Sequence, residues 1–187
     1  DFGIALLAAL GIVGQLAAAA LAAGIVAWFA RPASRTALAG ARDTVGRAGV
    51  WLAWVVAGGA MLGSLWLSNG AHFIPCHLCW LQRYAMYPLV VVLIVVALAR
   101  RWWLTLAAMA FPLVGMGISA WHVWVENHPD DATASCRQGV PCSVKWIEEY
   151  GYITIPVLAG TAFVLIALLL GIAAFWQRSQ RSPEGGA

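Results

Sequence analysis

Four cysteines in two pairs are the residues of this chain whose types and spacing could do chemistry. Cys76 and Cys79 lie in the stretch PCHLCWLQRY, and Cys136 and Cys142 lie in SCRQGVPCSVKW. Such pairs can attach a haem, bind zinc, stabilise a fold as structural disulfides, or exchange electrons as a dithiol. A c-type haem needs a histidine directly after the second cysteine. Trp80 stands there instead, which excludes haem attachment.

The close spacing of the first pair favours redox chemistry. A disulfide between Cys76 and Cys79 closes a very short loop, so it constrains the unfolded chain little and adds little stability to the fold. Short Cys-x-x-Cys pairs are instead typical of redox dithiols. Two purely structural disulfides and a four-cysteine zinc site remain as alternatives, although the wider spacing of Cys136 and Cys142 disfavours zinc.

A helix that begins near Pro75 would place both cysteines of the first pair at its N-terminus. The unpaired N–H groups of a helix N-terminus stabilise a thiolate, and proline suits the first turn. Cys79, Arg83 and Tyr87 follow at i, i+4 and i+8, so they share one helix face. Arg83 lies just inside an apolar run, where a charge is costly, which makes it a candidate for binding an electron acceptor. The alternative is that its side chain extends to the lipid headgroups.

Three histidines could move protons near these cysteines. His72 and His77 are predicted to be loop residues, and the simpler interpretation is that they are ordinary surface side chains. His122 lies near the outer end of a later apolar run, at the depth expected for the cysteines, and could line the same cavity.

The second cysteine pair is predicted to lie in a mobile loop rather than a packed one. Gly139 and Pro141 lie between its two cysteines and are typical turn residues. A disulfide in an exposed loop can be reached by the thiolate of another protein, and thiol–disulfide exchange requires that access.

The composition predicts an integral membrane protein. Of the 187 residues, 62% are hydrophobic and 10% are charged, whereas a soluble domain is about 45–50% apolar and about 25% charged. The basic residues cluster at the ends of apolar runs, which argues against a nucleic-acid partner. Five runs are long enough, or nearly so, to cross a bilayer as helices: Phe2–Ala30, Val50–Ser68, Trp80–Ala99, Trp102–Val125 and Ile153–Trp176. The first is too long for the apolar segment of a secretory signal.

Arginines gather in alternate connections between these runs. Eight of the eleven basic residues lie within residues 31–49, at Arg100–Arg101 and after the fifth run. The positive-inside rule therefore predicts an N-terminus outside, a C-terminus in the cytoplasm, and all four cysteines on the outer side, where disulfides persist. Residues 31–49 are then a cytoplasmic linker and residues 177–187 a cytoplasmic tail.

Residues 126–152 form the predicted outer loop. Within it, VKWIEEY is predicted either as a short amphipathic helix on the membrane surface, with Trp146, Ile147 and Tyr150 facing the lipid, or as an extension of the last membrane helix.

Two stretches, PCHLCWLQRYAMYPL and GVPCSVKWIEEYGYITIPVLAG, closely resemble the DsbB family of bacterial disulfide-bond-formation proteins. The similarity covers residues 50–176 and is greatest to the short-loop branch often called BdbC. The resemblance implies an all-α integral membrane protein with a four-helix bundle at residues 50–176. It also implies that this bundle binds ubiquinone or menaquinone and reoxidises a thioredoxin-fold partner of the DsbA type. Residues 1–30 are expected to add one N-terminal transmembrane helix outside the usual family pattern. We expect a monomer in the bacterial inner, or plasma, membrane, in contact with lipid.

The resemblance also implies roles for individual residues. Cys76 and Cys79 match the quinone-linked pair, with Cys79 in contact with the quinone and Arg83 beside its ring. Cys136 and Cys142 match the loop pair, and Cys136 would form the mixed disulfide with the partner. Tyr87 and His122 join the quinone site as candidates from their positions, and no metal ligand is expected. In the rival vitamin K epoxide reductase type the loop pair precedes the Cys-x-x-Cys, whereas here it follows, which favours DsbB.

Overall fold

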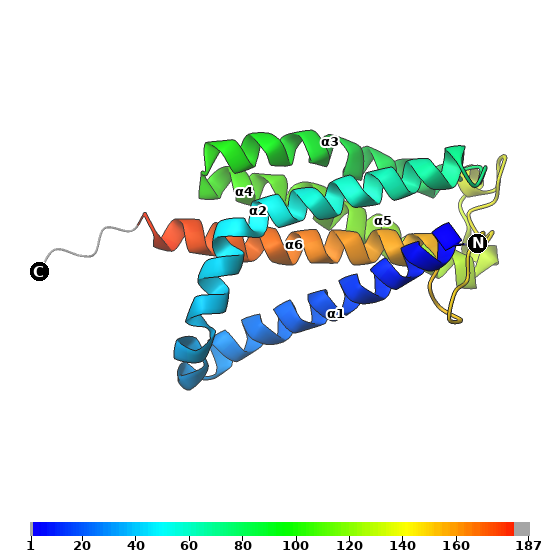
Figure 1. Cartoon of the computed structure of the whole chain (residues 1–187). Coiled ribbons are helices and arrows are strands. Elements are labelled where there is room, and N and C mark those ends of the chain that lie inside the picture. Colours follow the sequence, from blue (N-terminus) through cyan, green and yellow to red (C-terminus); the bar gives the residue numbers. More distant parts are fainter. Residues whose placement is uncertain (1, 182–187) are drawn as a thin grey trace, which may run out of the picture.

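The computed structural model describes residues 2–181, and helices form most of this part of the chain (Figure 1). Within these residues six α-helices follow one another: α1 (Phe2–Ala30), α2 (Pro32–Asn69), α3 (His77–Ala99), α4 (Trp102–Ala108), α5 (Ala110–Asn127) and α6 (Ile155–Ser179). Two 3-10 turns, η1 (Pro129–Asp131) and η2 (Ala134–Cys136), lie between α5 and α6. With α4 and α5 counted as one span, the described part of the chain has five helical segments that are long and apolar enough to cross a membrane. The predicted all-α membrane fold is therefore confirmed. Asp1 and residues 182–187, which include most of the predicted tail, lie outside the described residues.

The fourth predicted span is broken into α4 and α5 at Met109. The cause lies three residues further on, at Pro112. A proline inside a helix has no N–H for the carbonyl of the residue four positions earlier, here Ala108, and its ring pushes that carbonyl away. The break therefore falls where the helical hydrogen bond is lost.

Residues 31–49 are not a separate connection, because α2 runs without interruption from Pro32 to Asn69. Pro32 occupies the first turn, where proline is well tolerated, and the alanines and arginines that follow favour a helix. Figure 1 shows the first part of α2 running across the end of α1 before the helix turns along the bundle.

Helices α2, α3, α4–α5 and α6 form a four-helix bundle, with α1 outside it against α2 and α6. Helix α6 packs against α2, α4 and α5, and α3 packs against the same helices from the other side. The core between them is made of large apolar side chains that are almost completely buried, including Leu89, Leu93, Phe163, Ile166 and Leu170.

Both cysteine pairs lie at one end of this bundle, here called the cysteine end, near the N-terminus of α1 (Figure 1). The arginine-rich segments, which include the first part of α2, lie at the opposite end. Arg42 there donates to the Ser179 hydroxyl at 2.6 Å, and Arg181 donates to the carbonyl oxygen of Arg100 at 2.8 Å. The predicted grouping of the two cysteine pairs is therefore confirmed.

The connection between α5 and α6 is neither of the two forms predicted for VKWIEEY. Helix α6 begins only at Ile155, and the preceding residues form turns and extended segments. Tyr150 and Gly151 both have positive φ, which ends any helical path, and Glu149 and Ile153 exchange two backbone hydrogen bonds. Trp146 stacks on Phe73 with ring centres 5.1 Å apart, which ties this connection to the segment before α3.

Candidate redox site

Cys76 and Cys79 lie at the N-terminus of α3, which begins at His77, two residues after Pro75, so the predicted position of both cysteines at a helix start is confirmed. Cys76 is the capping residue, and its sulfur accepts a hydrogen bond from the Cys79 backbone N–H at 3.3 Å. Both cysteines are free thiols, with their sulfur atoms 2.8 Å apart. The helix N-terminus therefore directs its unpaired N–H group at Cys76. His77, expected in a loop, is the first residue of the helix and is exposed.

His122 of α5 contacts Cys76 in the protein interior. Its Nε2 lies 3.6 Å from the Cys76 sulfur and 3.2 Å from the carbonyl oxygen of Cys142. Because a carbonyl can only accept, Nε2 carries the hydrogen of that contact. The hydrogen bond with the Cys79 thiol and the neighbouring His122 together lower the pKa of Cys76 well below its ordinary value, although burial opposes them.

Cys136 and Cys142 form a disulfide that is packed inside the protein. Their exposed fractions are 0% and 1%, and they lie in one buried apolar cluster with Cys76, Leu78 and Val125. The prediction of an exposed disulfide in an unpacked loop was wrong. Gly139 and Pro141 do form an irregular loop, but the sulfur atoms turn inward because the ends of α3 and α5 offer an apolar surface to cover.

Arg83 is held by hydroxyl and carbonyl groups of α2. Its Nε donates to the Ser64 hydroxyl at 3.0 Å, and one terminal nitrogen donates to the Ser64 carbonyl oxygen at 3.1 Å and to the Ser68 hydroxyl. The guanidinium also lies over the Trp80 ring, 5.1 Å from its centre. The charge is thus fixed one turn below Cys79 and does not depend on the lipid headgroups.

A cavity of about 520 Å³ opens beside this arginine, between α1, α2, α3 and α6. Cys79, Arg83 and Tyr87 all line it, so the predicted shared face of α3 is confirmed. Tyr87 reaches toward α2, with its hydroxyl 3.4 Å from that of Ser64. His122 is not among the lining residues and lies on the other side of the cysteines, toward the loop disulfide. The first pair therefore lies between the loop disulfide and the cavity.

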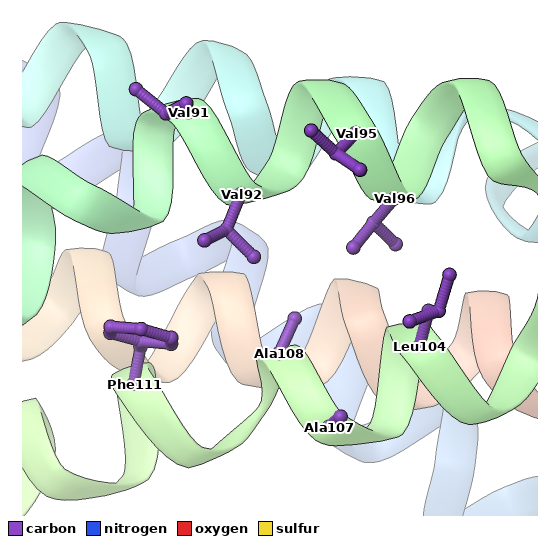
Figure 2. A pocket seen from close by; sticks show the side chains of 8 residues that line it. All are labelled: Val91, Val92, Val95, Val96, Leu104, Ala107, Ala108 and Phe111. Carbon is purple, nitrogen blue, oxygen red and sulfur yellow. The ribbon is translucent and has the colours of Figure 1, made fainter.

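A second cleft, between α3 and the α4–α5 span, has no comparable chemistry. Figure 2 shows Val92 and Val96 of α3 facing Leu104, Ala108 and Phe111 across a gap. All eight side chains that line this cleft of about 310 Å³ are hydrocarbon, so nothing there could orient a polar ligand.

Sequence reasoning missed several polar residues that the fold buries around the site. Glu126, assigned to the outer loop, belongs to the last part of α5, is 7% exposed and accepts a hydrogen bond from Thr154 at 2.7 Å. Gln82 donates to Ser119 at 3.0 Å, also in the interior. The spacing of Glu126 four residues after His122 was the available signal, because it puts both on one face of α5.

The structure offers fewer possible metal ligands than the sequence suggested. Cys136 and Cys142 are bonded to each other and offer no thiolates, so the four-cysteine zinc site is not formed. Three possible ligands remain within 4.8 Å of one another: the sulfur atoms of Cys76 and Cys79 and a ring nitrogen of His122.

A free dithiol at a helix N-terminus, a buried disulfide beside it and five membrane-length helical segments together define a membrane-embedded thiol–disulfide protein. The family described as "Disulfide bond formation protein DsbB" matches residues 46–173, and the chain belongs to this family. It is thus a disulfide-bond-formation protein, as the sequence resemblance implied.

Curated relatives agree with this assignment. The chain is 44% identical over 115 residues to "Probable disulfide formation protein C" of Halalkalibacterium halodurans, an alignment that covers 60% of this chain and 83% of that protein. It is 40% identical over 122 residues to "Disulfide bond formation protein C" of Bacillus subtilis, covering 65% of this chain and 88% of the relative. No solved structure matches the chain.

Proposed function

We propose that this protein reoxidises a thioredoxin-fold partner of the DsbA type and passes the electrons through its two cysteine pairs to a membrane quinone. The observation that carries the proposal is the position of the first pair. Cys76 lies in the same buried cluster as the Cys136–Cys142 disulfide, whereas Cys79 lines the cavity that contains Arg83. This arrangement supports exchange with the loop pair through Cys76 and contact with the quinone through Cys79.

The cavity has the character that a quinone requires. One end carries the Arg83 guanidinium and the Tyr87 hydroxyl, which can donate hydrogen bonds to a ring oxygen, and the Cys79 sulfur lies beside them. Apolar side chains make up most of the remaining wall. A quinone bound there supplies a two-electron, two-proton acceptor for the first pair.

The residues of the chain then act in two exchange steps. A thiolate of the reduced partner attacks the Cys136–Cys142 disulfide, and the partner leaves as a disulfide while Cys136 and Cys142 become thiols. These two thiols then reduce a Cys76–Cys79 disulfide and close their own bond again, so two electrons and two protons move inward. The structure, with the loop pair bonded and the first pair free, corresponds to the product of the second step.

His122 is placed to hold a proton during the second step. Its Nε2 lies between the Cys76 sulfur and the carbonyl oxygen of Cys142, and stabilising a Cys76 thiolate favours its release as a leaving group. Its position supports a role between the two pairs rather than at the quinone ring.

The experiment that tests the function adds reduced partner and a soluble quinone to the purified protein and follows quinone absorbance. We expect quinone loss with the wild-type protein and none with Cys79→Ser or Cys136→Ser. His72→Ala, a surface change near the first pair, is the matched control and should behave as the wild type. No quinone loss with wild-type protein, or undiminished loss with Cys79→Ser, would contradict the proposal.

Thiol labelling separates the rival interpretations. A structural-disulfide scaffold predicts that mild dithiothreitol leaves a Cys76–Cys79 bond intact, and a zinc protein predicts a stoichiometric metal ion at Cys76, Cys79 and His122. The redox proposal instead predicts that the mass after alkylation rises by two labels when quinol or dithiothreitol is added, with no bound metal.

We also propose that the cysteine end faces the outside of the bacterial plasma membrane. The arginines at the other end support this orientation through the positive-inside rule. A cysteine placed at exposed Asn127 in a variant without other cysteines should react with a membrane-impermeant maleimide added to intact cells, whereas one at exposed Arg101 should not.

A further inference from the structure

Helix α1 lies outside the family match, which begins at residue 46, yet it forms one wall of the cavity that contains Arg83 and Cys79. We propose that α1 and the facing part of α2 hold the hydrocarbon tail of the quinone, so that this added helix sets which tail lengths the protein prefers. The inference rests on the proposed function and names a second part of the same binding site.

The cavity is polar at one end, and along the rest of its length the lining is apolar apart from Thr161. The polar end lies at Arg83, Ser64 and Ser68, near the cysteines. From there the wall continues along α2 through Gly59 to Val55. On α6 the lining extends from Ile155 to Leu165, a distance of roughly 15 Å at the rise of an α-helix. A ring alone would not need such a length, whereas a ring followed by a hydrocarbon chain would.

Helix α1 supplies only apolar atoms to the far part of this wall. Leu10, Val13 and Ala17 line the cavity, in order from the cysteine end. Leu10 and Val13 are 57% and 62% exposed in the protein alone. In a bilayer such side chains face hydrocarbon, and a tail lying along them exchanges lipid contact for protein contact of fixed shape.

Polar contacts hold α1 in this position. Gln15 is the polar residue of the α1 run, and its amide nitrogen lies 3.5 Å from the Thr161 hydroxyl of α6. The same side chain accepts a hydrogen bond from the Tyr152 hydroxyl at 2.8 Å. Such bonds are favoured between membrane helices, where water cannot replace them. Gly11 lets the two helices come together, because a Cβ there would overlap Leu158.

The occupant follows from the continuity of the cavity. An acyl chain of a phospholipid could fill the apolar part, but only a ligand with a redox ring also places a carbonyl oxygen at the arginine and an acceptor beside Cys79. The quinone therefore uses both ends of the cavity, and a phospholipid occupant becomes one outcome of the test.

Two neighbouring glycines of α2 provide a matched pair of variants. A Cβ added at Gly58 or at Gly59 meets no atom within 4 Å, so neither position is closed to a side chain at its first carbon. Gly59 lines the cavity and Gly58 does not. Gly59→Leu should therefore fill the tail region, whereas Gly58→Leu adds the same side chain to the same helix outside it. Leu10→Ala on α1, with Leu6→Ala as its control, tests the opposite wall by removing contact instead of adding bulk.

The measurement is the dissociation constant of a tail-free and a long-tail quinone, taken from the quenching of tryptophan fluorescence, together with the quinone that copurifies. For Gly59→Leu we expect the affinity for the long-tail quinone to fall about tenfold relative to Gly58→Leu, the effect of losing roughly two buried methylene groups. The tail-free quinone should be affected much less. Leu10→Ala should lower long-tail affinity relative to Leu6→Ala in the same direction.

Three results would overturn the inference. The tail site is rejected if affinity depends on tail length equally in Gly59→Leu and Gly58→Leu, and if Leu10→Ala binds the long-tail quinone as well as Leu6→Ala does. That result would leave quinone reduction intact. Copurified phospholipid that long-tail quinone does not displace identifies a lipid site instead. Failure of the wild-type protein to bind either quinone contradicts the proposed function itself, so the two failures are distinguishable.

Discussion

The Nε2 atom of His122 lies 3.6 Å from the sulfur of Cys76, although 46 residues separate them in the chain. The contact joins a residue near the end of one membrane span to the residue that caps the start of another, at the point where the two cysteine pairs meet. It also gives the thiolate of Cys76 a hydrogen-bond donor in an interior where water is scarce.

Replacing His122 should make Cys76 less reactive at acidic pH. The thiolate is the reacting form, and its pKa is lowered by the Cys79 thiol and by His122. In His122→Leu the pKa of Cys76 should rise from about 4, so the midpoint of its titration should move to higher pH, and at pH values below the wild-type midpoint the thiolate fraction should fall about tenfold for each pKa unit of the rise. The rate of iodoacetamide labelling of Cys76, read by mass spectrometry across pH, measures this. His128→Leu, at an exposed histidine, should leave the profile unchanged, and equal profiles for both variants would refute the role of His122.

Replacing Arg83 should weaken quinone binding while both cysteine pairs still form their disulfides. Alanine removes the charge and its contacts with Ser64 and Ser68. Arg83→Lys should bind with intermediate affinity, because an ammonium is a point charge that cannot copy the fork of a guanidinium. The dissociation constant for quinone measures the effect, and Arg137→Ala in the exposed loop is the control. An affinity unchanged by Arg83→Ala would count against the arginine.

Replacing Thr154 should destabilise the protein at the junction of α5 and α6. In Thr154→Val the buried Glu126 loses its hydrogen-bond donor, which we expect to cost about 1–3 kcal/mol of unfolding free energy. The Thr154 side chain makes no capping bond to α6, so the change leaves helix capping unaffected. Thermal unfolding in detergent provides the measurement. Thr133→Val, at an exposed threonine, should have little effect, and equal melting temperatures would rule out this contact as stabilising.

Replacing Trp146 should expose the loop disulfide. Trp146 lies four residues after Cys142, and its stack on Phe73 ties this part of the loop to the segment before α3. A partner cannot reach the buried sulfur atoms of Cys136 and Cys142 unless the loop moves. In Trp146→Ala we expect glutathione to reduce the Cys136–Cys142 bond several times faster than in the wild type. Tyr150→Ala, at an exposed aromatic residue of the same connection, serves as the control. If both variants are reduced at the wild-type rate, the stack does not limit access.

The membrane spans could be predicted from the sequence because lipid leaves the backbone few choices. An apolar run without water must satisfy its own hydrogen bonds, so the predicted bounds of Phe2–Ala30 and the end of α3 at Ala99 agree with the structure. The number of spans also fixes which connections share a side, and this placed both cysteine pairs together before any contact was known. The helical face shared by Cys79, Arg83 and Tyr87 followed from their spacing alone.

The surroundings of the cysteines depended on contacts between distant segments. The burial of the Cys136–Cys142 bond requires the apolar ends of α3 and α5 to be covered, and the residues around Gly139 carry no periodic pattern that would reveal this. The hydroxyl groups that hold Arg83 come from α2, and the donor to Glu126 comes from the start of α6. Local sequence specifies which residues can form a helix and which face they share. Which side chains of other helices meet that face is decided by packing, where shape and hydrogen-bond partners from the whole chain must fit together.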